Sequence, residues 1–216
     1  MNKCWIIIGL VLITVFPAAA CEHTADEKPV ILVVGDSLSS AYGMDIEQGW
    51  VSLLERRLEE NSMDYRIVNA SISGDTTSGG LSRVKKALPE LDPALVVIEL
   101  GGNDGLRGLP LKSMTKNLQD MINLSAKQGT QPVLLGMRIP SNYGPRYTKE
   151  FHAIYADLSE QHAVPLVPFF MEGIALKPEL MQSDGIHPNV DAQSVLLNNA
   201  WPAIEKGLEL SCTSRR

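Results

Sequence analysis

A serine, a histidine and an aspartate in this sequence have the surroundings that nucleophilic catalysis requires. Ser37 comes just after the apolar run 30–34, at the end of a predicted strand, and His187 lies in the polar segment DGIHPN. A serine hydroxyl is a poor nucleophile until a base takes its proton, and that base needs an orienting partner. Asp184 lies three residues before His187. In one tight turn its carboxylate can reach Nδ1 of the imidazole and leave Nε2 free for Ser37.

Both segments also have a purely structural interpretation. Gly, Asp and Ser are common turn residues, and Asp or Ser can cap a following helix. The DGIHPN segment is also typical of an ordinary helix entry. Local sequence alone leaves these alternatives open. Of the other histidines, His23 precedes the first strand, and we expect His152 and His162 to lie on the solvated face of a helix, among charged residues.

Acyl transfer also needs hydrogen-bond donors for the oxyanion that develops on the attacked carbonyl. The backbone N–H of Ser37 is one candidate. Gly74 can offer a second backbone N–H with no side chain in the way. The side-chain amide of Asn103, in the segment GGND, is a third. A glycine-rich turn is the simpler interpretation of GGND on its own.

The elements that must position these residues follow an alternating pattern. Apolar runs rich in Val, Ile and Leu, without strict alternation, predict strands buried on both faces, as in parallel sheets. They cover residues 30–34, 66–68, 94–100, 133–139 and 165–167. Helical patterns cover residues 49–61, 80–88, 111–128 and 147–162, and a last helix begins near Asn189, a plausible N-cap. Pro202 predicts a kink or a break in that last helix.

This alternation predicts a single three-layer α/β/α doubly wound domain with about five parallel strands and right-handed crossovers. Ligands of such folds bind at the carboxyl ends of the strands. The polar segments 35–37, 69–76 and 101–104 each follow a predicted strand, and 184–189 lies between the last strand and the last helix. We therefore expect all four segments at one edge of the sheet.

The chain begins with a predicted secretory signal peptide, residues 1–20, with an apolar run that is too short to span a membrane and three alanines at the cleavage site. A flexible leader, 21–28, and the catalytic domain, 29–210, follow. The net charge is −6, and no Lys/Arg cluster stands out except the terminal Arg215-Arg216. We therefore expect no nucleic acid partner. No P-loop or zinc-ligand spacing occurs, so we expect no cofactor and no metal.

The cysteines leave three alternatives open. Cys4 departs with the signal peptide, whereas Cys21 and Cys212 remain at the two ends of the mature chain. Export would permit a Cys21–Cys212 disulfide. The thiols could instead stay unpaired, or Cys21 could carry a lipid anchor, although AAAC only loosely resembles a bacterial lipobox. We expect a monomeric periplasmic or secreted protein, membrane-anchored if Cys21 is lipidated.

The ordered set GDSLS, the Gly74 loop, GGND and DGIHPN resembles the SGNH (GDSL) hydrolase family, which has a flavodoxin-like fold. The resemblance implies Ser37 as nucleophile, His187 as base and Asp184 as its orienting acid. It also implies an oxyanion hole from Ser37, Gly74 and Asn103. The implied substrates are acyl esters, acyl thioesters and lysophospholipids. A narrower acetyl or aryl esterase and an inactive lipid-binding domain are the alternatives.

The segment RIPSNYGPRY follows the fourth predicted strand, at the edge where α/β folds build ligand sites. The resemblance implies that its residues Ile139, Pro140 and Tyr143 line the acyl-chain site. The alternative is an ordinary surface loop in which Ile139 ends a buried strand.

Overall fold

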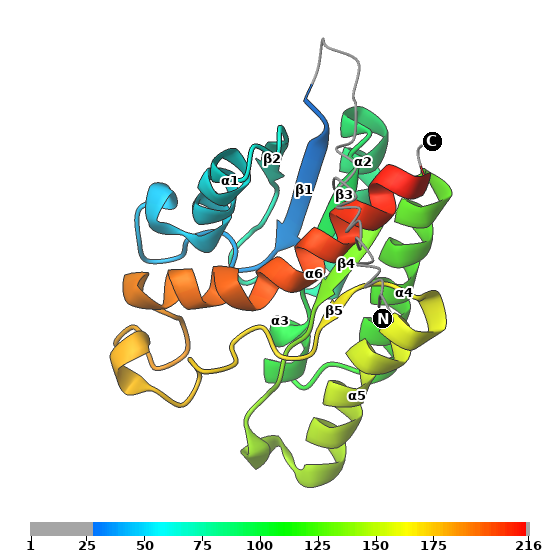
Figure 1. The fold of residues 1–216 in the computed structure, drawn as a ribbon. Coiled ribbons are helices and arrows are strands. Elements are labelled where there is room, and N and C mark those ends of the chain that lie inside the picture. Colours follow the sequence, from blue (N-terminus) through cyan, green and yellow to red (C-terminus); the bar gives the residue numbers. More distant parts are fainter. Residues whose placement is uncertain (1–27, 215–216) are drawn as a thin grey trace, which may run out of the picture.

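The computed structural model describes residues 28–214, which form one five-stranded sheet with helices on both faces (Figure 1). Every neighbouring pair of strands is parallel, and the spatial order is β2-β1-β3-β4-β5. This is the order of a doubly wound fold, so the predicted fold class is confirmed. The strands are β1 (Val30–Gly35), β2 (Arg66–Asn69), β3 (Leu95–Glu99), β4 (Gln131–Leu135) and β5 (Leu166–Val167).

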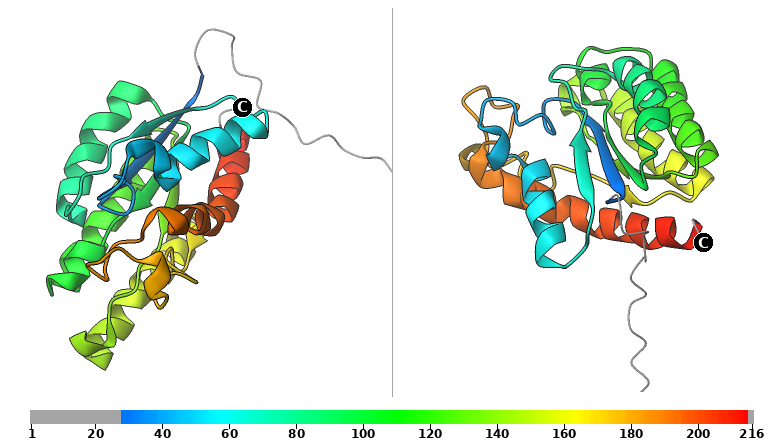
Figure 2. Two further views of the ribbon diagram at one scale, coloured as in Figure 1. Left: turned by 90° about the vertical axis from the view of Figure 1, so that its left-hand side faces the viewer. Right: turned by 90° about the horizontal axis from the view of Figure 1, so that it is seen from above.

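The helices divide between the two faces of the sheet. In the right-hand view of Figure 2, α1 and α6 cover one face, and α2, α4 and α5 cover the other. The helices are α1 (Trp50–Glu60), α2 (Thr77–Leu91), α3 (Gly102–Leu106), α4 (Leu111–Lys127), α5 (Pro145–His162) and α6 (Gln193–Ser214). Short 3₁₀ turns occur at η1 (Ile46–Gln48), η2 (Ser141–Tyr143), η3 (Pro178–Leu180) and η4 (Val190–Ala192).

This layering explains why the strand sequences lack polar alternation. Every residue of β1 and β3 is buried, because helices cover both faces of the two central strands. The helix α6 crosses β3 and β4 at close range, since a Cβ on Gly207 would lie 2.6 Å from a methyl of Val133 and 2.7 Å from one of Leu95. None of the helices in residues 28–214 is long and apolar enough to cross a membrane.

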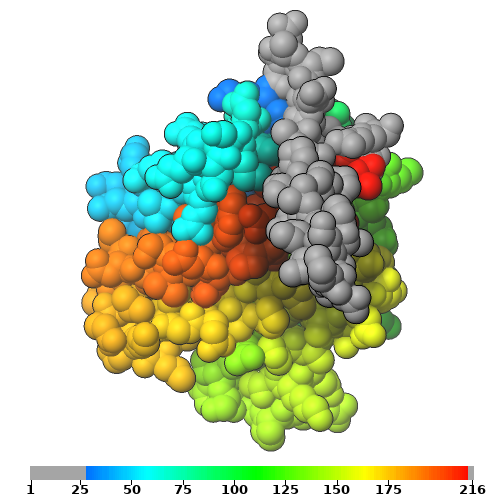
Figure 3. All heavy atoms as spheres, in the orientation of Figure 1, coloured from blue at the N-terminus to red at the C-terminus, as the bar shows by residue number. Residues whose placement is uncertain are grey.

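The helices α1 and α6 are adjacent, although they are far apart in sequence (Figure 3). Arg57 donates to Asn198 Oδ1 at 2.7 Å, and its guanidinium lies 5.5 Å from the ring centre of Trp201. The amide of Trp50, at the start of α1, donates to Gln193 Oε1 at 3.1 Å, at the start of α6. These contacts bring together the chain segments that follow Ser37 and His187.

The fourth strand is shorter than the predicted run 133–139. It ends at Leu135, and Gly136 then passes so close to the next segment that a Cβ would lie 2.7 Å from the carbonyl oxygen of Pro168. The chain leaves the sheet there, which frees Arg138 and Ile139 for the loop beyond the sheet edge.

Two further predictions need correction. GGND is not a turn, because its last three residues begin the short helix α3; Gly101, with a φ of +114°, precedes it. Of the kink or break predicted at Pro202, the break does not occur, because helix α6 runs unbroken from Gln193 to Ser214. The N-cap at Asn189 is confirmed, since its side chain accepts a hydrogen bond from the amide of Ala192 at the start of η4.

Candidate active site

The turn that carries Ser37 is built by its neighbour Asp36. Oδ1 of Asp36 accepts the amide of Leu38 at 3.1 Å, and the carbonyl of Asp36 accepts the amide of Ser40 at 3.1 Å. Gly35, the last residue of β1, has no room for a side chain, because a Cβ would lie 2.7 Å from Oε2 of Glu99. Ser37 therefore stands just past the end of β1, at the carboxyl edge of the sheet.

The structure brings the three predicted residues Ser37, His187 and Asp184 into one hydrogen-bonded chain. Nε2 of His187 lies 2.9 Å from Oγ of Ser37, and Nδ1 of His187 lies 2.6 Å from Oδ2 of Asp184. The His187 side chain is 19% exposed, so the imidazole is reachable from solvent. This geometry suits proton transfer from the hydroxyl to the imidazole.

Asp184 also caps the turn that contains His187. Its Oδ1 accepts the amides of Ile186 at 2.8 Å and His187 at 3.0 Å. The hydrogen bonds from the His187 amide and ring, followed by that from Ile186, lower the pKa of Asp184 to about 2. Asp184 is therefore a carboxylate at any ordinary pH and holds the Nδ1 side of the imidazole.

Gln182 ties the His187 turn to the segment that follows Ser37. Its side-chain amide donates to the carbonyl of Tyr42 at 2.8 Å and to that of Pro188 at 3.0 Å. Its backbone amide donates to the carbonyl of His187 at 2.7 Å. The ring of Tyr42 lies over the imidazole, with 4.4 Å between the ring centres. These contacts fix His187 relative to Ser37 across the sheet edge.

The Gly74 loop is fastened to the Ser37 turn. The amide of Ile72 donates to the carbonyl of Gly35 at 3.1 Å, and the hydroxyls of Ser40 and Ser73 are 2.7 Å apart. Gly74 has a φ of +77°, which favours glycine. Its carbonyl accepts the guanidinium of Arg107 at 2.7 Å, which connects the loop to the end of α3.

Asn103 reaches the same place from α3. Its Nδ2 donates to Oδ2 of Asp36 at 2.9 Å, so the amide lies beside the residue that precedes Ser37. Gly101, which precedes this helix, is required for two reasons: its φ of +114° favours glycine, and there is no space for a side chain. A Cβ at Gly101 would collide with the hydroxyl of Tyr155, which donates to the carbonyl of Leu100 at 2.9 Å.

The predicted acyl-wall residues lie next to the helix that carries Asn103. A methyl of Ile139 packs where a Cβ on Gly105 would lie, at 2.6 Å. The hydroxyl of Tyr143 donates to the carbonyl of Leu106 at 2.7 Å. Pro140 is exposed and precedes η2. The loop is therefore packed against α3, with exposed surface on its outer side.

The remaining histidines differ from expectation. His152 and His162 are half-buried, and each has one buried ring nitrogen without a hydrogen-bond partner, so the predicted solvated positions are wrong. Both lie on α5, whose amphipathic packing brings these positions toward neighbouring segments. His23 and Cys21 lie outside the described residues.

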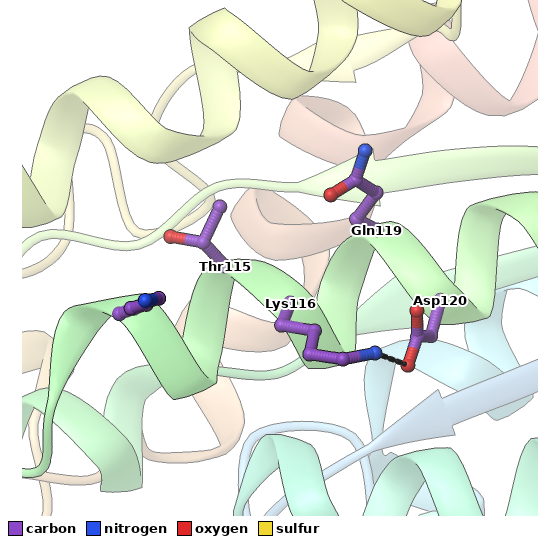
Figure 4. Close-up of a pocket in the computed structure, with 5 residues that line it drawn as sticks. Thr115, Lys116, Gln119 and Asp120 are labelled. Atoms are coloured by element: carbon purple, nitrogen blue, oxygen red, sulfur yellow. Dashed lines mark hydrogen bonds and ion pairs between the residues drawn. The ribbon is translucent and has the colours of Figure 1, made fainter.

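A hollow lies on the outer surface of α4, away from the Ser37 site (Figure 4). It is lined by Lys112, Thr115, Lys116, Gln119 and Asp120, and Lys116 pairs with Asp120 at 2.6 Å. All these residues come from one helix, and none of them is an activated nucleophile. Within residues 28–214, no cluster of His, Cys, Asp or Glu is arranged to hold a metal ion. The Ser37 site is therefore the candidate for chemistry.

Sequence reasoning missed the carboxyl pair beneath the Ser37 turn. Asp36 is 3% exposed and Glu99 is fully buried at the end of β3. Oε2 of Glu99 accepts the amide of Asp36 at 3.2 Å and the hydroxyl of Ser39 at 2.8 Å. Burial raises the pKa of both carboxyls, and that of Glu99 rises well above its usual range. A charged residue within an otherwise apolar strand was the available signal.

Comparison with known proteins agrees with this geometry. Residues 33–195 match the model of the GDSL-like lipase/acylhydrolase family. The chain is 51% identical to esterase TesA of Pseudomonas aeruginosa, over 81% of this chain and 87% of that protein. It is 47% identical to an arylesterase of Vibrio mimicus (86% and 92% covered).

A further relative is thioesterase 1/protease 1/lysophospholipase L1 of Escherichia coli K12, 44% identical over 90% of this chain and 87% of that protein. A crystal structure of TesA superimposes with a TM-score of 0.80 at 51% identity, covering 83% of this chain and 99% of that one. The chain thus belongs to the GDSL-like lipase/acylhydrolase family, whose members, the SGNH hydrolases, are enzymes that cleave ester bonds.

Proposed function

We propose that Ser37, His187 and Asp184 are the catalytic triad of an exported serine hydrolase that cleaves carboxylic esters and thioesters of acyl chains. The observation that carries the proposal is the continuous chain of contacts from Ser37 Oγ through the imidazole to Asp184, at 2.9 and 2.6 Å. In the contacts between residues 28–214, no other hydroxyl bonds to an imidazole that in turn bonds to a carboxylate.

In the proposed reaction, Ser37 Oγ attacks the carbonyl carbon of the substrate while its proton passes to Nε2 of His187. As the tetrahedral intermediate collapses, the imidazolium returns this proton to the leaving alkoxide or thiolate, and an acyl-serine ester remains. A water molecule then attacks the ester and gives its proton to His187. The second collapse releases the carboxylic acid and restores the Ser37 hydroxyl.

The developing oxyanion would be bound by the backbone amides of Ser37 and Gly74 and by Nδ2 of Asn103. Support comes from the contacts that gather these groups around the Ser37 turn: the Gly74 loop through Ser73 and the Asn103 side chain through Asp36. Donors that are fixed before reaction stabilise the transition state without reorganisation.

For substrate, we propose long acyl chains in esters, thioesters and lysophospholipids, with Ile139, Pro140 and Tyr143 beside the chain. The relative named as a thioesterase and lysophospholipase supports this class. The relative named as an arylesterase favours aryl or short-chain esters as the second candidate. Rates with p-nitrophenyl esters of graded length, palmitoyl-CoA and a lysophospholipid distinguish the two.

We also propose that residues 1–20 are removed on export and that the catalytic domain, 29–210, follows a short leader. The mature protein would then be periplasmic or secreted. Cys21 would either pair with Cys212 or carry a lipid anchor.

Ser37→Ala is expected to reduce ester and thioester hydrolysis by several orders of magnitude, because nucleophile and base act as a unit. A serine-directed organophosphonate should label Ser37 alone, as read by peptide mass. Ser82→Ala, the same change on the exposed face of α2, serves as the control and should keep native turnover. Substantial hydrolysis by the Ser37 variant would remove the triad assignment.

Asp184→Asn is expected to lower kcat by about 10⁴, because an amide cannot hold the imidazole in the tautomer that accepts the Ser37 proton. The native pKa of about 2 lies below the usual 3.8, so this carboxyl stays charged until the pH falls toward 2. Protonation of Asp184 should therefore contribute nothing to any loss of native kcat/KM at mildly acidic pH.

The pH profile of native kcat/KM and the kcat of the variant provide the measurement. Asp191→Asn, at an exposed carboxylate in η4, is the matched control and should behave like the native enzyme. An Asp184→Asn variant with near-native kcat would mean that Asp184 serves the turn and not the imidazole.

Ile139→Ala is expected to reduce kcat/KM for long-chain esters much more than for acetyl or butyryl esters. Each buried methylene of the substrate is worth about 0.8 kcal/mol, so a closed wall produces a steep dependence on chain length. Ile46→Ala, at an exposed isoleucine in η1, is the control. An equal loss at every chain length would take Ile139 out of the acyl site.

The mass of the mature protein separates the two fates of Cys21. Lipidation adds a diacylglyceryl group and places the protein in the membrane fraction. A disulfide with Cys212 instead lowers the mass by about two hydrogens and leaves the protein in the soluble fraction. An unmodified mass with two alkylatable thiols would contradict both alternatives.

A further inference from the structure

Asp36 occupies a position that connects the nucleophile turn with the Asn103 helix. Its carboxyl is buried, with 3% of the residue exposed. Oδ1 accepts the amide of Leu38, and Oδ2 accepts Nδ2 of Asn103 at 2.9 Å. Two separate donors thus converge on the two oxygens of one carboxyl group, which is the arrangement that an ionised carboxylate requires.

The contact with Asp36 determines which end of the Asn103 amide faces the reaction. The carbonyl and NH₂ ends of an amide have nearly the same shape, so hydrogen-bond partners decide its orientation. A carboxylate can only accept, and it therefore selects the Nδ2 end of Asn103. One N–H is used in this bond, and the second N–H is left for the oxyanion. The reversed amide would present a carbonyl oxygen to the developing negative charge.

Glu99 provides the means to keep Asp36 ionised in a buried place. Two adjacent buried carboxyls cannot both carry a charge, so one of them holds a proton. Burial and the charge of Asp36 raise the pKa of Glu99 well above its usual range. Oε1 of Glu99 is buried and accepts no hydrogen bond from residues 28–214, as expected of the oxygen that bears the proton.

Resting on the proposed oxyanion role of Asn103, we propose that Asp36 is a positioning residue of the reaction. Its carboxylate holds the Asn103 amide with an N–H toward the oxyanion, and Glu99 carries the proton of the buried pair. Asp36 touches neither substrate nor oxyanion in this role and acts through Asn103.

Other polar groups also face Asp36, and the experiment must separate them from Asn103. The Ser37 hydroxyl and a positive His187 both interact with its carboxyl. Arg83, from α2, also interacts with its charge, as does the buried phenol of Tyr155 from α5. An effect through Ser37 or His187 would be independent of Asn103.

The test is a double-mutant cycle of Asp36→Asn and Asn103→Ala. In Asp36→Asn, Oδ1 keeps the Leu38 amide, so an NH₂ group faces Asn103 and the Asn103 amide must reverse. We expect kcat to fall by about 10²–10³ in either single variant, with KM changed far less. The double variant should lose little beyond the single ones, because both changes remove the same donor.

Asp104→Asn is the matched control. Asp104 is also 3% exposed, but its carboxyl accepts hydrogen bonds from the amide and hydroxyl of Thr77 and none from Asn103. Its effect should multiply with that of Asn103→Ala. Thermal unfolding of every variant reports folding, and Asp36→Ser replaces Asp36→Asn if the latter does not fold.

The outcomes separate the two proposals. Native kcat in Asn103→Ala would overturn the oxyanion role itself. A large loss in Asn103→Ala that multiplies with that of Asp36→Asn would leave that role standing and overturn the role of Asp36.

A measurement on the unsubstituted enzyme tests the orientation of the Asn103 amide independently. The side-chain NH₂ signals of Asn103 in a ¹⁵N spectrum are identified by their absence in Asn103→Ala. Formation of the Ser37 phosphonate adduct should shift one of the two protons strongly and leave the other, bonded to Asp36, nearly unchanged. Equal shifts of both protons would contradict the proposed orientation.

Discussion

The register of β1 against β3 is the constraint on which the candidate site depends. Parallel pairing places Gly35 opposite Glu99, so both strands end at the same level and both following segments begin there. A slip of one residue would exchange the two faces of the strand and move the Glu99 carboxyl away from the Asp36 amide that it accepts. Because helices pack on both faces of the two strands, such a slip would also force the buried side chains on both faces to repack. The same packing that stabilises the core therefore sets the distance between the serine turn and Asn103.

Solvation divides the carboxyls of the site into two kinds. Asp184 lies in an exposed turn, where backbone amides and the imidazole stabilise its charge and lower its pKa to about 2. Asp36 and Glu99 lie in the interior, where burial raises both pKa values and only one charge is tolerated. The two environments favour different protonation states: Asp184 is an anion beside the imidazole of His187, whereas the buried pair is proposed to hold a proton. Such separation is how one fold assigns different tasks to chemically similar groups.

The fold and the clustering of polar segments were predictable because both depend on local pattern. Continuous apolar runs predict buried parallel strands, and parallel strands bring their carboxyl ends to one edge. The end of β4 was not predictable, since it depends on the approach of Gly136 to Pro168, a contact between distant segments. The charge of Glu99 in an apolar strand marks that residue alone, but its pairing with Asp36 joins residues 63 positions apart, and no local pattern indicates the partner. The half-buried His152 and His162 likewise follow from which neighbours pack on α5.

The two halves of the site differ in how they are held. The serine turn and the Asn103 helix are anchored to central strands through buried hydrogen bonds, whereas the His187 turn is attached largely by Gln182 and by contact with Tyr42. A short antiparallel bridge between Met181 and Pro188 closes that turn upon itself. Oxyanion donors must be fixed before reaction, because any reorganisation would subtract from the stabilisation that they give. The proposed base, His187, must instead exchange protons with the leaving group and with water, and a partly exposed imidazole on a closed turn meets that need. Ser37 and Asn103 follow central strands and are held firmly by them. His187 lies in a turn away from those strands and stays accessible to solvent.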